Sequence, residues 1–248
     1  MIPNPIRTVL SSMHGRRVRA LLMGGQACVF YGAAEFSRDT DIAILADSAN
    51  LARLRRALAD LSAECIAVPE LSVRNLRRGH AVHFRCMHPD AYRMRIDVMS
   101  SMRGVDDFPE LWRRRTTIVL PDGTRCDIMS LPDLLKAKKT QRDKDWPMIR
   151  RLIEAHYFGH RGRATPATVN FWLRELRTPA LLREVVLQHP RAAARWSPTR
   201  AAVAAAARDD SDAIEAALAA EELAERRADR EYWRPLIDEL SQMRRARK

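Results

Sequence analysis

The chain has 248 residues, enough for one or two domains with a sizeable hydrophobic core, and its 43 basic residues outnumber its 31 acidic ones for a formal net charge of +12. This excess favours a polyanionic partner such as a nucleotide or a nucleic acid, although coding bias toward arginine and alanine would give the same balance. There is no run of 18 apolar residues, residues 1–5 do not resemble a secretion signal, and the four cysteines lack metal-binding spacing. We therefore expect a cytoplasmic protein with reduced thiols and no membrane partner.

The first half of the sequence alternates between short strands and helices. Gly24-Gly25 is typical of a turn, and Asp47-Ser48 is typical of a helix N-cap. Apolar spacing predicts a helix over residues 5–20 and a strand over residues 21–23, followed by about two helical turns after Gly25. It then predicts a second strand over residues 39–45, a helix over residues 48–61 and a loop over residues 63–79.

Two antiparallel hairpins follow. Alternating apolar residues predict the first from residues 81–87 and 92–99, and the second from residues 116–120 and 125–128 around Pro121-Asp122-Gly123. After residue 130 the pattern becomes helical, with helices predicted over residues 131–141, 143–157, 166–176, 179–188, 198–207, 211–228 and 230–245. The expected fold class is α/β (α+β): a mixed sheet flanked by helices in a domain of residues 1–130, then an all-helical C-terminal domain of residues 131–248.

Three acidic residues stand out in the predicted sheet. Asp39 and Asp41 lie two apart on a strand and so face the same side, where two carboxylates repel each other unless a cation holds them. Asp97 interrupts an otherwise apolar strand end, which suits a metal ligand or a general base, although a pair with Arg95 or Arg93 at a strand edge would also explain it. Two Mg²⁺ ions on three carboxylates could clamp a triphosphate and an attacking hydroxyl.

The glycine pair and some cations are candidates for binding the nucleotide. Gly24 and Gly25 precede a helix and leave backbone N–H groups free to approach a phosphate. Arg38 precedes the acidic pair, and Lys138 is our candidate from the basic run at residues 136–144, although such runs are usually solvated helix faces. Phosphate-binding glycines with metal-binding carboxylates predict phosphoryl or nucleotidyl transfer.

These motifs resemble the polymerase-β-like nucleotidyltransferase superfamily. GGQACVFYG is similar to the Gly-Gly-x-Ala start of aminoglycoside-type nucleotidyltransferases, EFSRDTDIAIL is similar to the Ser-x-Asp-h-Asp-h strand of AbiEii-type toxins, and LPDLLKAKKTQRDKDWPMIRRL resembles the helical segment that follows the core in that group. The resemblance covers residues 18–157. It implies a mixed sheet with helices on its faces and Mg²⁺-dependent transfer of NMP from an NTP, with Asp39, Asp41 and Asp97 as catalytic and metal-binding residues.

The acidic motif departs from the family pattern at two positions. Thr40 stands between the two acids, where the family has an apolar residue. In an alternative register the metal pair would fall at Asp41 and Ala43, which leaves a broken site and a nucleotide-binding or inactive relative. We favour Asp39 and Asp41, because this register keeps both acids and leaves Ile42 and Ile44 on the buried side of the strand.

The acceptor is left open among RNA, a small molecule and a protein hydroxyl. The basic residues Arg113-Arg114-Arg115 and the run at 136–144 favour RNA such as tRNA, bound through its phosphates. The resemblance also implies a possible role as the toxin of a toxin–antitoxin pair. Two rival interpretations remain: a catalytically degenerate core that binds a nucleotide or RNA, and a helical region that binds a partner such as an antitoxin or a second copy of the chain.

Overall fold

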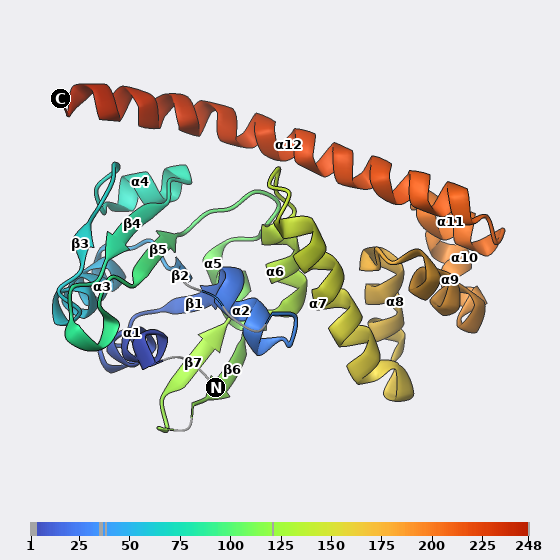
Figure 1. Ribbon diagram of the computed structural model, residues 1–248, viewed down its shortest axis with the longest axis horizontal. Helices are drawn as coiled ribbons and strands as arrows, with labels where there is room; N and C mark the ends of the chain where they lie inside the picture. The colour runs from blue at the N-terminus through green and yellow to red at the C-terminus, as the bar shows by residue number, and fades with distance from the viewer. Residues whose placement is uncertain (1–3, 35–36, 38, 121, 248) are drawn as a thin grey trace. The chain divides into compact units, whose positions relative to one another are not determined.

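The computed structural model describes residues 4–34, 37, 39–120 and 122–247, and the chain divides into two compact units. The first unit comprises Met1–Phe30, Ala34–Ala137 and Glu231–Lys248, and the second comprises Tyr31–Ala33 and Lys138–Arg230. The contacts thus group residues 131–137 and the last 18 residues with the sheet, whereas the sequence pattern alone placed a boundary after residue 130. Figure 1 labels the elements of both units.

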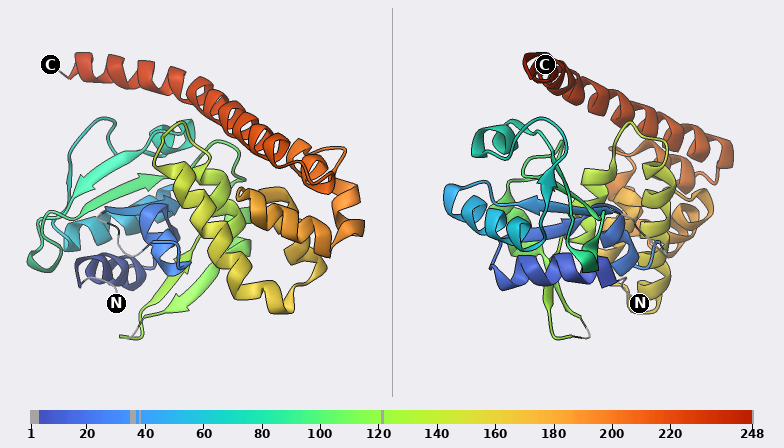
Figure 2. Two further views of the ribbon diagram at one scale, coloured as in Figure 1. Left: turned by 45° about the vertical axis from the view of Figure 1, so that its right-hand side comes forward. Right: turned by 60° about the vertical axis from the view of Figure 1, so that its left-hand side comes forward.

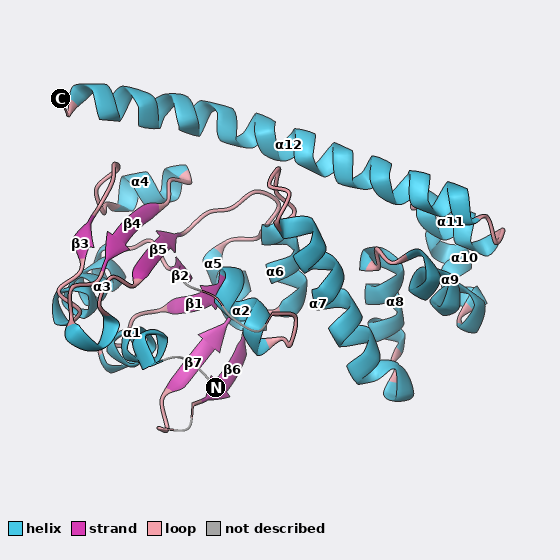
Figure 3. Cartoon of the chain, in the orientation of Figure 1, coloured by secondary structure: helices cyan, strands magenta, loops and turns pink. Residues whose placement is uncertain are grey.

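The first unit is built on a mixed seven-stranded sheet in the order β3-β4-β5-β2-β1-β7-β6 (Figure 3). Its strands are β1 (Ala20–Met23), β2 (Asp39–Ile44), β3 (Glu64–Cys65), β4 (Val82–Arg85), β5 (Arg95–Met99), β6 (Thr116–Val119) and β7 (Arg125–Ile128). Strand β1 pairs antiparallel with β2 and parallel with β7, and β2 pairs parallel with β5. The two predicted hairpins are confirmed as the antiparallel pairs β4–β5 and β6–β7, and the second forms one edge of the sheet in Figure 2. The predicted mixed sheet is therefore correct.

Helices accompany the sheet in the first unit. They are α1 (Asn4–Gly15), α2 (Gly24–Phe30), α3 (Ser48–Asp60), α4 (Val73–Arg78), α5 (Phe108–Arg114) and α6 (Leu131–Lys138, whose last residue belongs to the second unit), with the short 3₁₀ turn η1 (Pro89–Ala91) between β4 and β5. Helix α3 begins as predicted, because the Asp47 side chain accepts a hydrogen bond from the Asn50 backbone N–H.

The buried side chain of Asn50 fixes helix α3 to the end of the sheet. Its carboxamide oxygen accepts from the Arg19 backbone N–H at 2.8 Å, and its amide group donates to the carbonyl oxygens of Arg19 and Leu45 at 3.0 and 2.9 Å. Buried backbone groups need partners, and here one side chain supplies three of them. Strands β1 and β2 thus keep a fixed position beside α3.

The prediction of a loop over residues 63–79 was correct mainly for residues 66–72, between a short strand and a helix. The stretch from 63 to 79 also contains β3 and the helix α4, which Ser72 caps at its start and Gly79, with a φ of 102°, at its end. Six residues are too few for a clear 3.6-residue period. Contacts with residues far along the chain accompany this helix: Glu239 accepts from Arg78 Nε at 2.8 Å and lies 2.7 Å from His80 Nε2.

The second unit is helical, as the sequence predicts. Its elements are α7 (Asp145–His160), η2 (Arg161–Arg163), α8 (Pro166–Glu175), α9 (Pro179–Gln188), α10 (Pro190–Trp196), α11 (Ala201–Ala207) and the first part of α12 (Ser211–Ala246). Two details differ. The helix predicted over 198–207 is the shorter helix α11, and α10 precedes it. The two helices predicted over 211–228 and 230–245 form the single helix α12, which has Pro235 in its interior. Within the described residues, no helix has both the length and the apolar character needed to cross a membrane.

Charged side chains are buried between the helices of the second unit. Arg200 donates to the backbone oxygens of Leu173 and Leu176, both at 2.7 Å, and pairs with Glu221. Arg177 lies with its guanidinium 4.8 Å above the Trp146 ring. Arg200 thus satisfies the last carbonyl groups of α8 and joins them to α12.

His156 is held in its neutral form by its surroundings in the second unit. The Trp172 indole N–H, which can only donate, bonds to His156 Nδ1 at 3.0 Å, and the His160 ring stacks on His156 with centroids 4.2 Å apart. Burial, and after it the charge of His160, lowers the pKa of His156 to about 4. Between pH 6.5 and 4 the unfolded chain therefore binds a proton at this position that the folded chain does not, so acidification through this window destabilises the fold.

We expect His156→Gln to lose less stability than the wild type between pH 7 and pH 4.5. Glutamine offers an oxygen to Trp172 but does not titrate. The measurement is the urea unfolding midpoint at both pH values, followed by tryptophan fluorescence. His14→Gln, at an exposed position of α1, serves as the control and should behave as the wild type. Equal loss of stability in His156→Gln and the wild type would contradict this account of His156.

Candidate functional site

Three aspartates lie on one face of the sheet in the first unit. In β2, Asp39, Asp41 and Ala43 alternate with Thr40, Ile42 and Ile44, so the two acids share a side. The parallel pairing of β2 and β5 places Asp41 beside Asp97 and Asp39 beside Arg95. Neighbouring strands are about 4.8 Å apart, so Asp41 and Asp97 are adjacent on the same face.

A histidine completes this group. Strand β4 pairs antiparallel with β5, and His83 lies directly opposite Asp97. We use the term acidic face for the side chains of Asp39, Asp41, His83, Arg95 and Asp97.

The Asp97 carboxylate is held by two neighbours. Its Oδ1 atom accepts from Arg95 Nε at 2.7 Å and lies 2.8 Å from His83 Nδ1. Arg95 Nη2 also lies 3.2 Å from His83 Nδ1, but one ring nitrogen cannot donate to a carboxylate and accept from a guanidinium at once. The shorter contact to an anion favours an Nδ1–H that donates to Asp97, and this assignment defines the histidine tautomer.

The charges of this group follow from these contacts. Burial alone would raise the pKa of Asp97, but the hydrogen bonds from His83 and Arg95 outweigh it and hold that pKa below its usual value. The pKa of Arg95 is raised by its hydrogen bond to Asp97 and further by the charges of Asp97, Asp39 and Asp41. Asp97 is therefore an anion and Arg95 a cation that acts on all three carboxylates.

Gly24 is required by the position of Asp41. It opens α2 with a φ of 66°, and a Cβ atom there would lie 1.7 Å from Asp41 Oδ2. At Gly25 a Cβ atom would lie 2.7 Å from the hydroxyl oxygen of Ser37. The glycine pair thus leaves room for the side chains that follow it, and its role toward a phosphate stays a prediction.

Thr40 and Ala43, the two positions at which the acidic motif departs from the family pattern, are both buried. Thr40 is fully buried on the side of β2 opposite the acids, where its hydroxyl has no hydrogen-bond partner among the described residues. Ala43 is also fully buried, on the side of the acids, with Leu21 and Met99 as its strand neighbours. Asp39 and Asp41 are partly accessible, whereas Ala43 has no exposed surface.

The two cations predicted to bind the nucleotide are not part of this group as described. Arg38 lies outside the described residues. Lys138 belongs to the second unit, where it is buried and its Nζ atom lies 3.3 Å from Asp145 Oδ1. The role of both residues stays a prediction.

The aspartates fit a magnesium site in donor type and in backbone position. Carboxylate oxygens are the ligands that Mg²⁺ prefers, and the strand register brings Asp41 and Asp97 together. Among the described residues, however, no group of three or more His, Cys, Asp and Glu side chains lies close enough to hold a metal ion. Asp97 is engaged by Arg95 and His83 instead, so the side chains would have to rearrange before three carboxylates could share a cation.

His83 is the member of the acidic face that sequence reasoning missed. Its side chain is 26% exposed and bonds to Asp97. Alternation on β4 places His83 and Arg85 on the polar side of that strand, but only the pairing of β4 with β5 identifies Asp97 as the partner. The pair between Arg95 and Asp97, which we had considered as an alternative, is present.

The basic residues expected to contact RNA are largely engaged by acids. Arg113 pairs with Glu110, Arg114 with Asp106 and Asp133, and Arg115 with Asp127. The run at 136–144 is engaged in the same way. Lys136 pairs with Asp133, and Lys139 pairs with Glu175. Asp145 pairs with both Lys138 and Arg142. These ion pairs reduce the positive potential that the run offers to a phosphate backbone.

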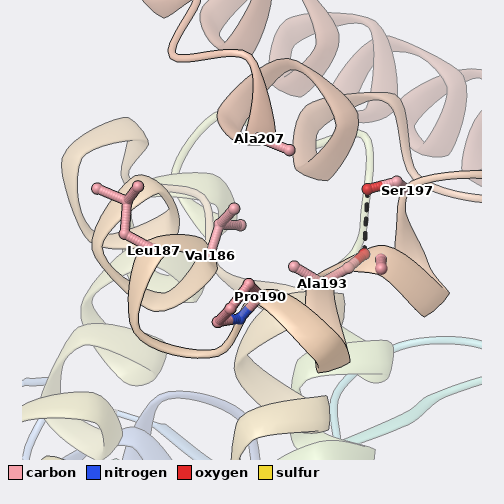
Figure 4. Close-up of a pocket in the computed structure, with 7 residues that line it drawn as sticks. Val186, Leu187, Pro190, Ala193, Ser197 and Ala207 are labelled. Atoms are coloured by element: carbon pink, nitrogen blue, oxygen red, sulfur yellow. Dashed lines mark hydrogen bonds between the residues drawn. The ribbon is translucent and has the colours of Figure 1, made fainter.

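Two cavities lie among the helices of the second unit. One, of about 430 Å³, is lined by Val186, Leu187, Pro190, Ala193, Ala194, Ser197 and Ala207 (Figure 4). Its one hydroxyl, that of Ser197, donates to the Ala193 carbonyl oxygen at 3.0 Å. A second cavity of about 500 Å³ is also lined by residues of this unit, among them His189 and Arg195. Neither cavity has an aspartate or a glutamate among its lining residues.

Burial shields three of the four thiols. Cys28, Cys86 and Cys126 are buried, as predicted for most of the cysteines, and Cys65 is exposed. Burial raises the pKa of Cys86 to about 11 and, with the charge of Asp127, that of Cys126 to about 12. The chain matches no protein-family model and no curated protein.

We expect Gly24→Ala to destabilise the first unit. Alanine strains the backbone at a φ of 66°, and its methyl group collides with the Asp41 carboxylate. The cost should reach about 2 kcal/mol or more, measured as a fall in the thermal unfolding midpoint.

Two variants separate these causes. Gly15→Ala, at the end of α1 where nothing lies within 4 Å of the new methyl group, should leave the midpoint nearly unchanged. In an Asp41→Ala background the cost of Gly24→Ala should shrink, because the collision is gone and only the backbone strain remains. The same cost in both backgrounds would show that Asp41 does not occupy this position.

Proposed function

We propose that the chain is a nucleotidyltransferase of the polymerase-β-like kind, which moves NMP from an NTP to a hydroxyl acceptor in the cytoplasm. The observation that supports this most is the register of β2 and β5. This register sets Asp41 beside Asp97, and Asp39 lies two residues earlier on the same face. Gly24 lies against the Asp41 carboxylate. The sequence motifs and the mixed sheet agree with this arrangement.

The residues of the acidic face have distinct tasks in this proposal. Asp39, Asp41 and Asp97 would hold Mg²⁺, and the bound cation would neutralise charge on the triphosphate. Asp97, kept ionised by its neighbours, also has the charge needed to accept a proton from the attacking hydroxyl. His83 orients the Asp97 carboxylate through its hydrogen bond. Gly24 and Gly25 open α2, where the triphosphate would approach the backbone.

RNA, and tRNA in particular, is the acceptor that the charge of the chain favours. A net charge of +12 attracts a polyanion at long range, even though the arginines at 113–115 are paired with acids. Activity on RNA would suit the toxin of a toxin–antitoxin pair. An antitoxin, or a second copy of the chain, would then be the natural partner of the apolar surface around Leu187 in the second unit.

A second candidate function is binding of a nucleotide or RNA without chemistry. It is favoured by the engagement of Asp97 with Arg95 and by the absence, among the described residues, of an assembled group of three metal ligands. The two candidates differ in outcome: the enzyme transfers label from an NTP, whereas the binding protein only retains the NTP.

The test is transfer of labelled NMP to total tRNA in the presence of Mg²⁺, with each of the four NTPs. We expect transfer by the wild type and a decrease of about 100-fold or more in Asp41→Asn, because the amide loses the charge that a metal ligand needs. Asp90→Asn, an exposed position between β4 and β5, is the matched control and should retain activity.

Other outcomes have a clear meaning. Retention of an NTP by the wild type without transfer to tRNA, to protein or to small hydroxyl compounds would favour the binding function. Equal transfer by Asp41→Asn and the wild type would exclude the acidic face as the active site.

A further inference from the structure

Arg95 occupies the position in the acidic face where a cation is needed. Its Nε atom donates to Asp97 Oδ1 at 2.7 Å, and the strand register sets it beside Asp39. Its pKa is raised by Asp97 first and by Asp39 and Asp41 as well, so one guanidinium acts on three carboxylates. We propose that Arg95 is an internal competitor for divalent metal ions: it neutralises the acidic face when no metal is bound and opposes the binding of a metal ion to Asp97.

The contacts of Asp97 explain why the two cations compete for its carboxylate. Oδ1 of Asp97 already accepts from both Arg95 and His83. A divalent cation such as Mg²⁺ binds carboxylate oxygens at about 2.0–2.1 Å, so a guanidinium nitrogen that stays on the same oxygen would lie against a second positive charge. The two cations repel each other, and the oxygen cannot serve both at full strength.

The exposure of the two side chains shows which of them can move. The Arg95 side chain is 42% exposed, whereas that of Asp97 is 15% exposed. Arginine has a long flexible stem and a guanidinium that is stable in water, so it can swing outward while the carboxylate stays in place. The cost of this movement is the lost ion pair, and that cost lowers the affinity of the site for metal.

The charge count gives the direction of the effect. Removal of the guanidinium takes one positive charge away from a group that contains three carboxylates. Affinity for divalent cations rises with the number of uncompensated carboxylates. Loss of the Arg95 charge should therefore increase metal affinity, although it removes a partner from a half-buried acid.

The experiment measures binding of Mn²⁺ alone, by electron paramagnetic resonance of the free ion, to the wild type and to Arg95→Gln. Glutamine keeps a hydrogen-bond donor near Asp97 but not the positive charge. We expect at least a fivefold lower Kd for Arg95→Gln, and we expect Asp41→Asn in the same background to abolish the gain. An unchanged or higher Kd in folded Arg95→Gln would overturn the inference.

Arg85→Gln is the matched control. Arg85 lies opposite Arg95 in the pairing of β4 and β5, on the same face, and is exposed. Among the contacts of the described residues it has no hydrogen bond or ion pair with a carboxylate, so its substitution removes one nearby charge and no contact to Asp97. We expect a change in Kd of less than twofold, and a gain equal to that of Arg95→Gln would overturn the specific role of Arg95.

A conservative variant covers the case in which Arg95→Gln does not fold, as judged by circular dichroism. Arg95→Lys keeps the charge but lacks the Nε donor, so its grip on Asp97 is weaker and its Kd for Mn²⁺ should fall below that of the wild type, by less than in Arg95→Gln. A Kd equal to or above the wild-type value in Arg95→Lys would overturn the inference.

This inference rests on the proposed function only for the presence of a metal site. Mn²⁺ binding is measured without nucleotide or acceptor, so the two can fail separately. Tighter Mn²⁺ binding by Arg95→Gln without nucleotidyl transfer by the wild type would support the role of Arg95 and reject the enzyme. Transfer by the wild type with equal Mn²⁺ binding by both proteins would do the opposite.

Discussion

Repulsion between carboxylates on neighbouring parallel strands is the constraint on which the first unit depends. Asp41 and Asp97 are adjacent in register, and Asp39 follows on the same side. Partly buried anions this close require a positive charge or a hydrogen-bond donor, and Arg95 and His83 provide both on the β5 side. A face that served only to stabilise the sheet would carry apolar or uncharged residues, because these need no counter-charge. Three acids with a compensating cation therefore cost the sheet stability that apolar residues would not.

The turn between β1 and α2 belongs to the same constraint. Only a residue without a side chain can leave space for the Asp41 carboxylate and adopt the left-handed backbone of Gly24. Gly24 and Asp41 are 17 positions apart in the sequence, yet each restricts which side chain fits at the other position. Packing against Asp41 therefore explains why glycine is needed at position 24. A phosphate that approached the backbone here would meet a conformation that this packing already fixes.

Local patterns in the sequence predicted the elements well, and distant contacts account for what they missed. Alternation gave both hairpins and the side of β2 on which Asp39 and Asp41 lie, because these depend on neighbours along the chain. The pair of His83 with Asp97 depends on the register between two strands, so it left no local signal. Helix α4 left no local signal either, and it is accompanied by contacts of the distant Glu239 with Arg78 and His80. Helix α12 was divided at residue 229 in the prediction, whereas it is continuous from Ser211 to Ala246.

The same lack of distant information affected the reading of positive charge. Lys139 appears in the sequence within a basic run, but in the fold it lies 2.9 Å from Glu175. Most of the cations near residues 113–115 and 136–144 are likewise neutralised by acids from other elements, so they explain the packing of the helices better than the attraction of RNA. By contrast, Arg53 and Arg56 on the outer side of α3 are exposed, and within the described part of the chain no ion pair engages them. If the net charge of the chain attracts an RNA, the unpaired arginines of α3, rather than the basic run, have the charge left to bind its phosphates.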